Sequence, residues 1–360
     1  MDQLTHVSTF KLPKLKSYNW AQFTFNYAKG PIAYRPVTNT LLIRGHGSYK
    51  EVAEVNIPDN GDTATLLGDW FDITGGLLDQ RIQQLGRQVY LYGLFIDEED
   101  IVFGGIAEYY NVTNANDPPF FYTDYRFKQS KGFWLGDIAT ELQLSRWVTR
   151  LSPELSKYYG VRYAGGCTTA QGVSGSSYGP NMYVFNLPDQ NLPTGAMSVK
   201  KIIGYTRLDP WVVNNETYWP SWECNTGISL PNSMIWVGRR GYGDPDDLKL
   251  MRDQKQSTAA WYGEASETFT NGATTTTLKD VGSPYRGYHS LHYTPSIWQI
   301  SNTDLMAGNL NYSAIDLSGV MHEPGAHLSA TYDWQGKRLF ILEERAMDGV
   351  MPLIHVYSVQ

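Results

Sequence analysis

The sequence predicts an all-β fold, a five-bladed β-propeller, from three observations. Two ten-residue stretches, YRPVTNTLLI at 34–43 and YDWQGKRLFI at 332–341, align without a gap. Each reads as a tyrosine, a polar turn and an apolar strand, so a hairpin of one design stands near each end of the chain. Strand and turn signals recur along the chain without long amphipathic helices. Apolar and polar residues also alternate over 7–12, as in an edge strand.

A ring of repeated sheets must be sealed where the chain meets itself. We expect residues 7–12 to form the fourth strand of the last blade, beside strands at 326–332, 338–343 and 353–359. Pairing the first strand with the last sheet would remove an open sheet edge.

The other blades follow from runs of strand-forming residues separated by turn residues. We expect a first sheet at 30–34, 40–44, 51–57 and 65–71, and a second at 88–97, 101–110 and 120–126, with 131–136 either completing it or beginning the next. The third has strands at 162–168, 178–186 and 199–205, and the fourth at 227–230, 234–238, 259–263 and 296–300, with an insertion at 264–285. A further sheet between the second and third regions would make six blades. Composition does not shift along the chain, which predicts one domain over 1–360.

One or two short helices are expected within 137–160. Leu142, Leu144, Trp147, Val148 and Leu151 are apolar, and Ser152-Pro153-Glu154 reads as a helix cap followed by proline at the first helical position.

Composition and charge exclude several classes of protein. The net charge of −7 argues against nucleic-acid or anionic-membrane binding, which needs a basic stripe. Apolar runs are too short to span a membrane, and the N-terminus lacks the apolar region of a secretory signal. The two cysteines, Cys167 and Cys224, are too few for a disulfide scaffold. They either pair or remain buried thiols, and the second interpretation is preferred.

A candidate ligand-binding face follows from propeller geometry. Loops from second to third strands open on the same face as the segments that enter each innermost strand, and here these loops are rich in glycine, arginine and aromatic residues. Arginine offers a planar donor fork for carboxylates or sugar hydroxyls, and aromatic rings stack on sugars. The candidate ligand-binding residues are Arg44, His46, Trp222, Arg239, Arg240 and Tyr242. The competing interpretation is structural: such residues also tie adjacent blades together.

No motif specifies a metal or a catalytic centre. His289 and His292, and His322 and His327, have spacings loosely compatible with zinc, but they match no tight motif. Glu223 and Glu323 are candidate carboxylates for glycan chemistry, although sequence cannot supply their separation. We expect no cofactor.

Several phrases, among them PIAYRPVTNTLLIRGHGSYKEVAEVNIP, SMIWVGRRGYGD and TYDWQGKRLFILEE, resemble a family of uncharacterised β-propeller proteins of bacteria and tailed phages. The resemblance covers most of the chain outside 110–160 and 245–285. It implies the fold and no established activity. The missing leader fits a phage virion protein released by lysis, and equally a cytoplasmic protein.

The sequence is compatible with two functions. The first is a non-enzymatic recognition or structural module, such as a virion tail, receptor-binding or decoration protein that binds a surface glycan or another virion or cell-surface protein and works alone or in an assembly. The alternative is a glycan-active enzyme, such as a glycoside hydrolase, that uses carboxylates at the channel mouth.

Overall fold

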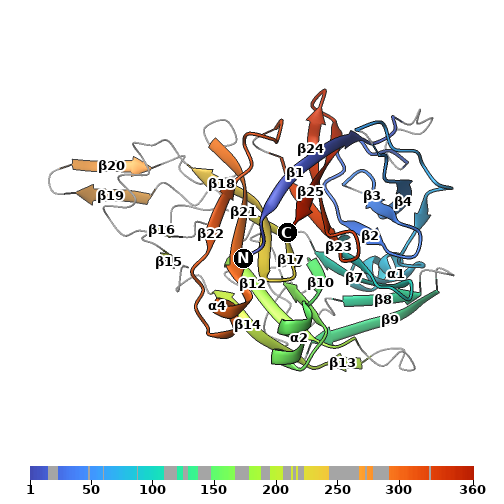
Figure 1. Ribbon diagram of the computed structural model, residues 1–360, viewed down its shortest axis with the longest axis horizontal. Helices are drawn as coiled ribbons and strands as arrows, with labels where there is room; N and C mark the ends of the chain where they lie inside the picture. The colour runs from blue at the N-terminus through green and yellow to red at the C-terminus, as the bar shows by residue number, and fades with distance from the viewer. Residues whose placement is uncertain are drawn as a thin grey trace.

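The protein is all-β, and its sheets take up a propeller arrangement (Figure 1). The computed structural model describes residues 1–14, 23–47, 49–59, 61–86, 88–108, 120–124, 129–136, 147–166, 178–187, 195–205, 212–213, 216–217, 223–242, 267–271, 274–278, 292–323 and 326–360. Within these residues there are four four-stranded sheets, a five-stranded sheet and two two-stranded ribbons.

The closing sheet joins the two ends of the chain, in the order β1-β25-β24-β23. Its strands are β1 (Leu4–Lys11), β23 (Leu328–Asp333), β24 (Arg338–Met347) and β25 (Met351–Val359). β1 pairs antiparallel with β25, and Gln3 and Gln360 exchange backbone hydrogen bonds at 3.0 and 3.1 Å. The predicted circular closure is therefore confirmed, and the termini lie side by side near the middle of Figure 1.

The next two sheets follow in chain order. The first sheet, β2-β3-β4-β5, contains β2 (Ile32–Arg35), β3 (Thr40–Arg44), β4 (Glu51–Asn56) and β5 (Phe71–Asp72). The five-stranded sheet contains β6 (Val89–Ile96), β7 (Ile101–Glu108), β8 (Phe120–Asp124), β9 (Gln129–Gly136) and, parallel to β9, β13 (Gly195–Met197). Helix α1 (Leu77–Leu85) lies between these sheets in the chain.

The remaining four-stranded sheets are β10-β11-β12-β14 and β17-β18-β21-β22. Their strands are β10 (Trp147–Arg150), β11 (Tyr163–Gly166), β12 (Tyr178–Phe185), β14 (Val199–Tyr205), β17 (Glu223–Ser229), β18 (Ser233–Tyr242), β21 (His292–Ser301) and β22 (Ser313–Asp316). The ribbons are β15 (Val212–Val213) with β16 (Glu216–Thr217), and β19 (Glu267–Asn271) with β20 (Thr274–Leu278).

Two local predictions meet different outcomes in these blades. Helix α2 (Pro153–Tyr159) confirms the predicted short helix: Pro153 begins it, and Ser152 Oγ accepts a hydrogen bond from the Leu155 N–H. The helical interpretation of Trp147 and Val148 is wrong, because they belong to β10, an inner strand with three consecutive buried residues. The predicted strand 259–263 lies outside the described residues, and β22 is the outer strand of its sheet. A third short helix, α4 (Asn302–Met306), follows β21.

The apolar core lies between neighbouring sheets, in five clusters of buried residues among the described part of the chain. Phe10 and Phe340 of the closing sheet, for example, pack with Leu41 of the first sheet. The inner strands also contact one another in sequence, β2 with β6, β6 with β10, β10 with β17, β17 with β23 and β23 with β2. Face-to-face packing of this kind holds every blade on both sides and fixes where the loops emerge.

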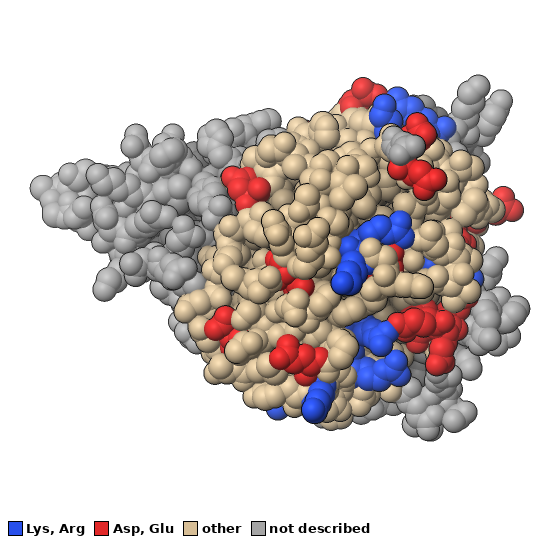
Figure 2. Space-filling view, viewed as in Figure 1, with Lys and Arg blue, Asp and Glu red and all other residues tan. Residues whose placement is uncertain are grey.

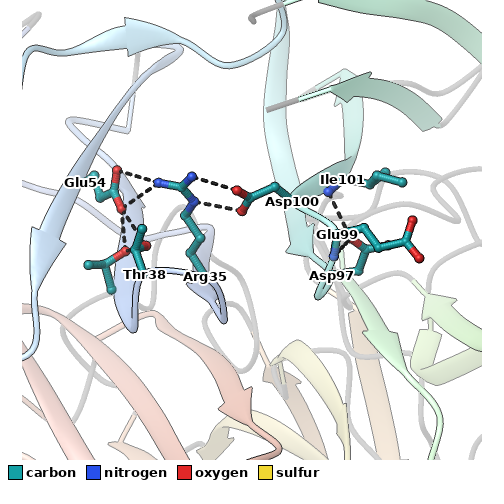
Figure 3. Close-up of polar contacts among 8 residues, drawn as sticks. Arg35, Thr38, Glu54, Asp97, Glu99, Asp100 and Ile101 are labelled. Atoms are coloured by element: carbon teal, nitrogen blue, oxygen red, sulfur yellow. Dashed lines mark hydrogen bonds and ion pairs between the residues drawn. The ribbon is translucent and has the colours of Figure 1, made fainter. Parts of the chain in front are cut away.

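The turns between first and second strands are joined across sheets by polar contacts. The Arg35 guanidinium donates to Asp100 Oδ1 and Oδ2, at 2.8 and 2.7 Å, and to Glu54 Oε1 at 3.1 Å (Figure 3). Asp97 holds the turn that presents Asp100 by accepting from the Glu99 and Ile101 N–H groups at 2.9 Å. Arg35 thus ties two adjacent sheets together on this face.

Three further links of this kind lie between other neighbouring sheets. Arg150 pairs with Glu98, Arg338 donates to Asn39 Oδ1 at 2.6 Å, and the Asn232 N–H donates to Asp2. Figure 2 shows charges of both signs interspersed on the face it presents, without a single-sign field. No helix among the described residues is long and apolar enough to cross a membrane.

Candidate functional site

A pocket of about 490 Å³ opens on the face opposite the Arg35–Asp100 contact, where three sheets meet. The end of β3 and the start of β6 both reach this face, as does the end of β24. The described residues that line it are Tyr27, Lys29, Arg44, His46, Gly47, Tyr90, Tyr92 and Glu344. This is the face that the sequence predicted for ligand binding, and the structure brings Arg44 and His46 together on it.

Arg44 is the buried cation of the pocket, with 2% of its surface exposed. Its Nη1 donates to the Leu91 carbonyl of the neighbouring sheet, and its Nε has no hydrogen-bond partner among the described residues. Burial lowers the pKa of Arg44 to about 10, and the Tyr92, Glu344 and Tyr90 side chains oppose that shift. Arg44 therefore stays positively charged at neutral pH, and its charge lies beside the cavity.

The loop after β3 is shaped by Gly45. A Cβ at this position would lie 2.7 Å from both the Thr24 carbonyl oxygen and the Trp70 ring, so only glycine fits without a rearrangement. The His46 N–H donates to the same Thr24 oxygen at 3.0 Å, and this bond fixes the start of the loop. The RGHG motif thus places its histidine by close backbone packing.

His46 lies between two tyrosines. Its ring is edge-on to Tyr27 at 5.7 Å and to Tyr49 at 5.5 Å between centroids. Burial, followed by the charges of Arg44 and Lys29, lowers the pKa of His46. His46 is therefore neutral at neutral pH. Tyr27 has a positive φ of 55°, an unusual conformation for a bulky residue that is over-represented at functional sites.

The single lining carboxylate among the described residues is Glu344, which is 6% exposed. Its Oε2 accepts from the His327 N–H at 3.4 Å, and its Oε1 lies 3.8 Å from Arg345 Nε. The pocket therefore combines two cations, one anion and three tyrosine rings, an arrangement suited to a polar ligand with flat faces and a negative group.

The other predicted residues fall elsewhere or outside the description. Arg239 is buried in β18 and is not among the described residues that line this pocket. The backbones of Arg240, Tyr242 and Glu223 lie in β18 and β17, but their side chains, and Trp222 altogether, are outside the described residues. These assignments stay predictions. Cys224 is buried and Cys167 is outside the description, so their pairing also stays open.

Of the four predicted metal ligands, one lies in a polar cluster, one lies outside it, and two have side chains outside the described residues. His322 Nδ1 lies 3.3 Å from Glu343 Oε2, whereas the His327 ring is not part of that cluster. The side chains of His289 and His292 are outside the described residues. Glu323 donates its backbone N–H to Glu343 Oε1 at 2.6 Å, and no described contact places its carboxylate in the pocket.

Six lining residues were not among the predicted ligand-binding residues, namely Tyr27, Lys29, Gly47, Tyr90, Tyr92 and Glu344. Tyr90 and Tyr92 alternate with apolar residues at the start of β6, so their period-2 pattern was a signal that two polar-tipped rings share one side of the strand. Lys29 precedes the first predicted strand and carries no local signal.

The sequence matches no family model and no curated protein. Among solved structures, a luciferin-regenerating enzyme is similar, with a TM-score of 0.38 and 7% sequence identity over 94% of this chain and 92% of that chain. A TM-score this low carries no argument about activity.

Proposed function

We propose that this protein is a recognition module that binds an acidic glycan in the Arg44 pocket without chemically changing it. The observation that carries the proposal is a buried, charged guanidinium beside an open cavity lined with tyrosines. The cavity volume of about 490 Å³ falls within the range of roughly 300–1,000 Å³ that is usual for small-ligand sites.

The ligand chemistry follows from the lining. Arg44 and Lys29 would donate to a carboxylate, and Tyr27 and the two tyrosines of β6 would pack on sugar rings while their hydroxyls bond sugar oxygens. Loops on a rigid scaffold are where such contacts concentrate. The ligand class is thus a polyhydroxylated molecule with a negative group.

A glycan array tests this proposal. The protein should bind acidic glycans on the array and should not bind their neutral counterparts. Lys29→Ala should weaken this binding by about tenfold, as expected for a lost charged hydrogen bond. Lys14→Ala is the matched control, because Lys14 is exposed and pairs with Asp348 rather than lining the pocket. Equal binding by both variants, or no acidic glycan bound, would reject the proposal.

A second candidate, a glycan-active enzyme, is favoured by the buried carboxylate of Glu344. Glycoside cleavage uses two carboxyl groups, about 5–10 Å apart, and the described lining supplies one. Binding without turnover is therefore the better-supported function. Release of reducing ends from any bound glycan, lost in Glu344→Gln, Glu223→Gln or Glu323→Gln, would favour the enzyme instead.

We also propose five blades, with the β6–β9 sheet as one of them. The closed sequence of contacts among β2, β6, β10, β17 and β23 supports this count, as do the five apolar clusters between neighbouring sheets. An experimental structure that placed another sheet in this ring would overturn it.

The setting we propose is a phage particle, where the module would bind a host-surface glycan or a neighbouring virion protein. Support comes from the resemblance of the sequence to propellers of tailed phages. Mass spectrometry of purified particles would detect the chain among virion proteins, and its absence there would favour the cytoplasmic alternative.

A further inference from the structure

A second cluster of polar side chains lies on the closing sheet, on the other side of β24 from the pocket. Consecutive strand residues point to opposite faces, so Glu344 reaches the pocket while Glu343 turns toward His355 of β25. His322, from the connection between β22 and β23, completes the cluster. One ligand atom of each of His322, Glu343 and His355 lies within 4.8 Å of the others.

We propose that His322, Glu343 and His355 bind one divalent transition-metal ion, with zinc as the best match. Two imidazole nitrogens and one carboxylate oxygen form a donor set that zinc accepts, whereas calcium prefers six to eight oxygen atoms. Glu343 Oε2 lies 2.8 Å from His355 Nε2 and 3.3 Å from His322 Nδ1. Ligand atoms about 2.0–2.2 Å from a tetrahedral ion lie about 3.4 Å apart. The distance from Glu343 to His322 is already close to this value, and the distance from Glu343 to His355 would have to lengthen.

Two of the three ligands are already held in place. Glu343 Oε1 accepts from the His322 and Glu323 N–H groups, both at 2.6 Å, which orients Oε2 toward the histidines. His355 Nδ1 lies 3.0 Å from Thr9 Oγ1, which in turn lies 3.0 Å from His6 Nε2. A metal-binding histidine characteristically donates from its second ring nitrogen to such a partner, and Thr9 Oγ1 would accept from Nδ1–H in the tautomer that presents Nε2 to the ion.

Burial divides the site into a fixed inner part and an accessible outer part. The side chains of Glu343 and His355 are 0% exposed, whereas that of His322 is 52% exposed. An ion could therefore enter from the His322 side, where solvent would supply a fourth ligand. A hydrogen bond now joins His355 Nε2 and Glu343 Oε2. For Nε2 to bind the ion with its lone pair, the imidazole would take the tautomer whose proton is on Nδ1, and Nδ1–H would donate to Thr9 Oγ1.

The consequence is a structural clip at the ring closure. His322 precedes β23, Glu343 and His355 lie on adjacent strands, and Thr9 belongs to β1. One ion would thus tie the incoming connection to the closing sheet. Because the folded chain alone assembles these ligands, zinc would stabilise it against unfolding.

Titration of the chelator-treated full-length protein with zinc sulfate tests the inference. We expect one zinc ion per chain and a zinc-dependent rise in the unfolding temperature. His322→Ala, at an exposed position, should weaken zinc binding by at least about tenfold and remove the rise. His327→Ala, on the same connection but outside the cluster, should behave as wild type.

Circular dichroism without zinc would confirm that both variants fold. Cobalt(II) absorption bands in the wild type, absent from His322→Ala, would report the coordination directly. A wild-type chain that binds no zinc, or equal binding by both variants, would overturn the proposal.

Discussion

Arg35 and Asp100 form a two-pronged ion pair between neighbouring sheets, with donor–acceptor distances of 2.8 and 2.7 Å (Figure 3). The two side chains are 14% and 8% exposed, so solvent screens the pair only in part. Asp100 has a positive φ of 63°, and the turn held by Asp97 keeps it there. The pair therefore fixes the relative position of two blades, unlike an exposed surface ion pair, which contributes little to stability.

Asp100→Asn should lower the free energy of unfolding by about 1–3 kcal/mol. This loss is smaller than the cost of breaking a fully buried ion pair, because Arg35 keeps its hydrogen bond to Glu54 and remains partly exposed to solvent. Asparagine tolerates the left-handed backbone, so the loss would come from the ion pair. Denaturant unfolding measures it. Lys14→Ala, which breaks an ion pair that is 66% and 67% exposed, should cost under about 0.5 kcal/mol, and equal losses would argue against a clamp.

Phe10→Ala tests the closure of the ring. Phe10 is 1% exposed and packs in the cluster between the closing and first sheets, so its truncation should cost about 3–5 kcal/mol. Val7, on the same strand, is 61% exposed, and Val7→Ala should change stability by less than about 0.5 kcal/mol. Similar unfolding midpoints for the two variants would mean that β1 does not seal the propeller in solution.

Gly227→Ala tests the contact between inner strands β17 and β10. An added Cβ would lie 2.6 Å from the Trp147 ring, which is fully buried and has no room to retreat. Overpacking of this kind should cost about 1–3 kcal/mol. At Gly319 the same substitution meets nothing within 4 Å and should be neutral or slightly stabilising. Thermal unfolding of the two variants measures both changes in stability. A Gly227→Ala variant as stable as the wild type would contradict the close approach of Gly227 to the Trp147 ring.

The pKa of His46 gives a pH dependence whose sign differs between folding and binding. In the ligand-free protein this pKa is lowered, so the unfolded chain holds the proton more tightly and stability should fall as pH drops through the histidine range. A bound carboxylate would raise the pKa of His46, so glycan affinity should instead increase over that range, from about pH 8 to about pH 5. His46→Gln should flatten both profiles. Calorimetric titrations at several pH values check this, and an unchanged profile in the variant would assign the effect to another group.

Much of the fold could be predicted from local signals. The matched hairpins and the alternating residues of β1 identified the closure, because period-2 patterning survives wherever one side of a strand meets a core. Ser152 and Pro153 identified helix α2 through capping chemistry. β10 escaped detection because Trp147, Val148 and Thr149 are all buried, and a short strand buried on both faces has no alternation to find.

The sequence predicted only the part of the pocket that a single loop, the one after β3, contributes. The glycines around His46 marked their loop as a close-packed turn, but Tyr90 and Lys29 reach the pocket because separate sheets meet there. His355 lies within an apolar strand and gains its partners through pairing of β25 with β1 and β24. Contacts between distant segments depend on register and blade order, which a single sequence does not display.

The central claim is that the Arg44 pocket binds an acidic glycan, and a crystal structure with the best-binding array glycan tests it most directly. We predict electron density in the cavity, with the glycan carboxylate within hydrogen-bonding distance of Arg44 or Lys29 and a sugar ring packed on a tyrosine. Density at another surface, or an empty pocket at saturating glycan, would contradict the claim.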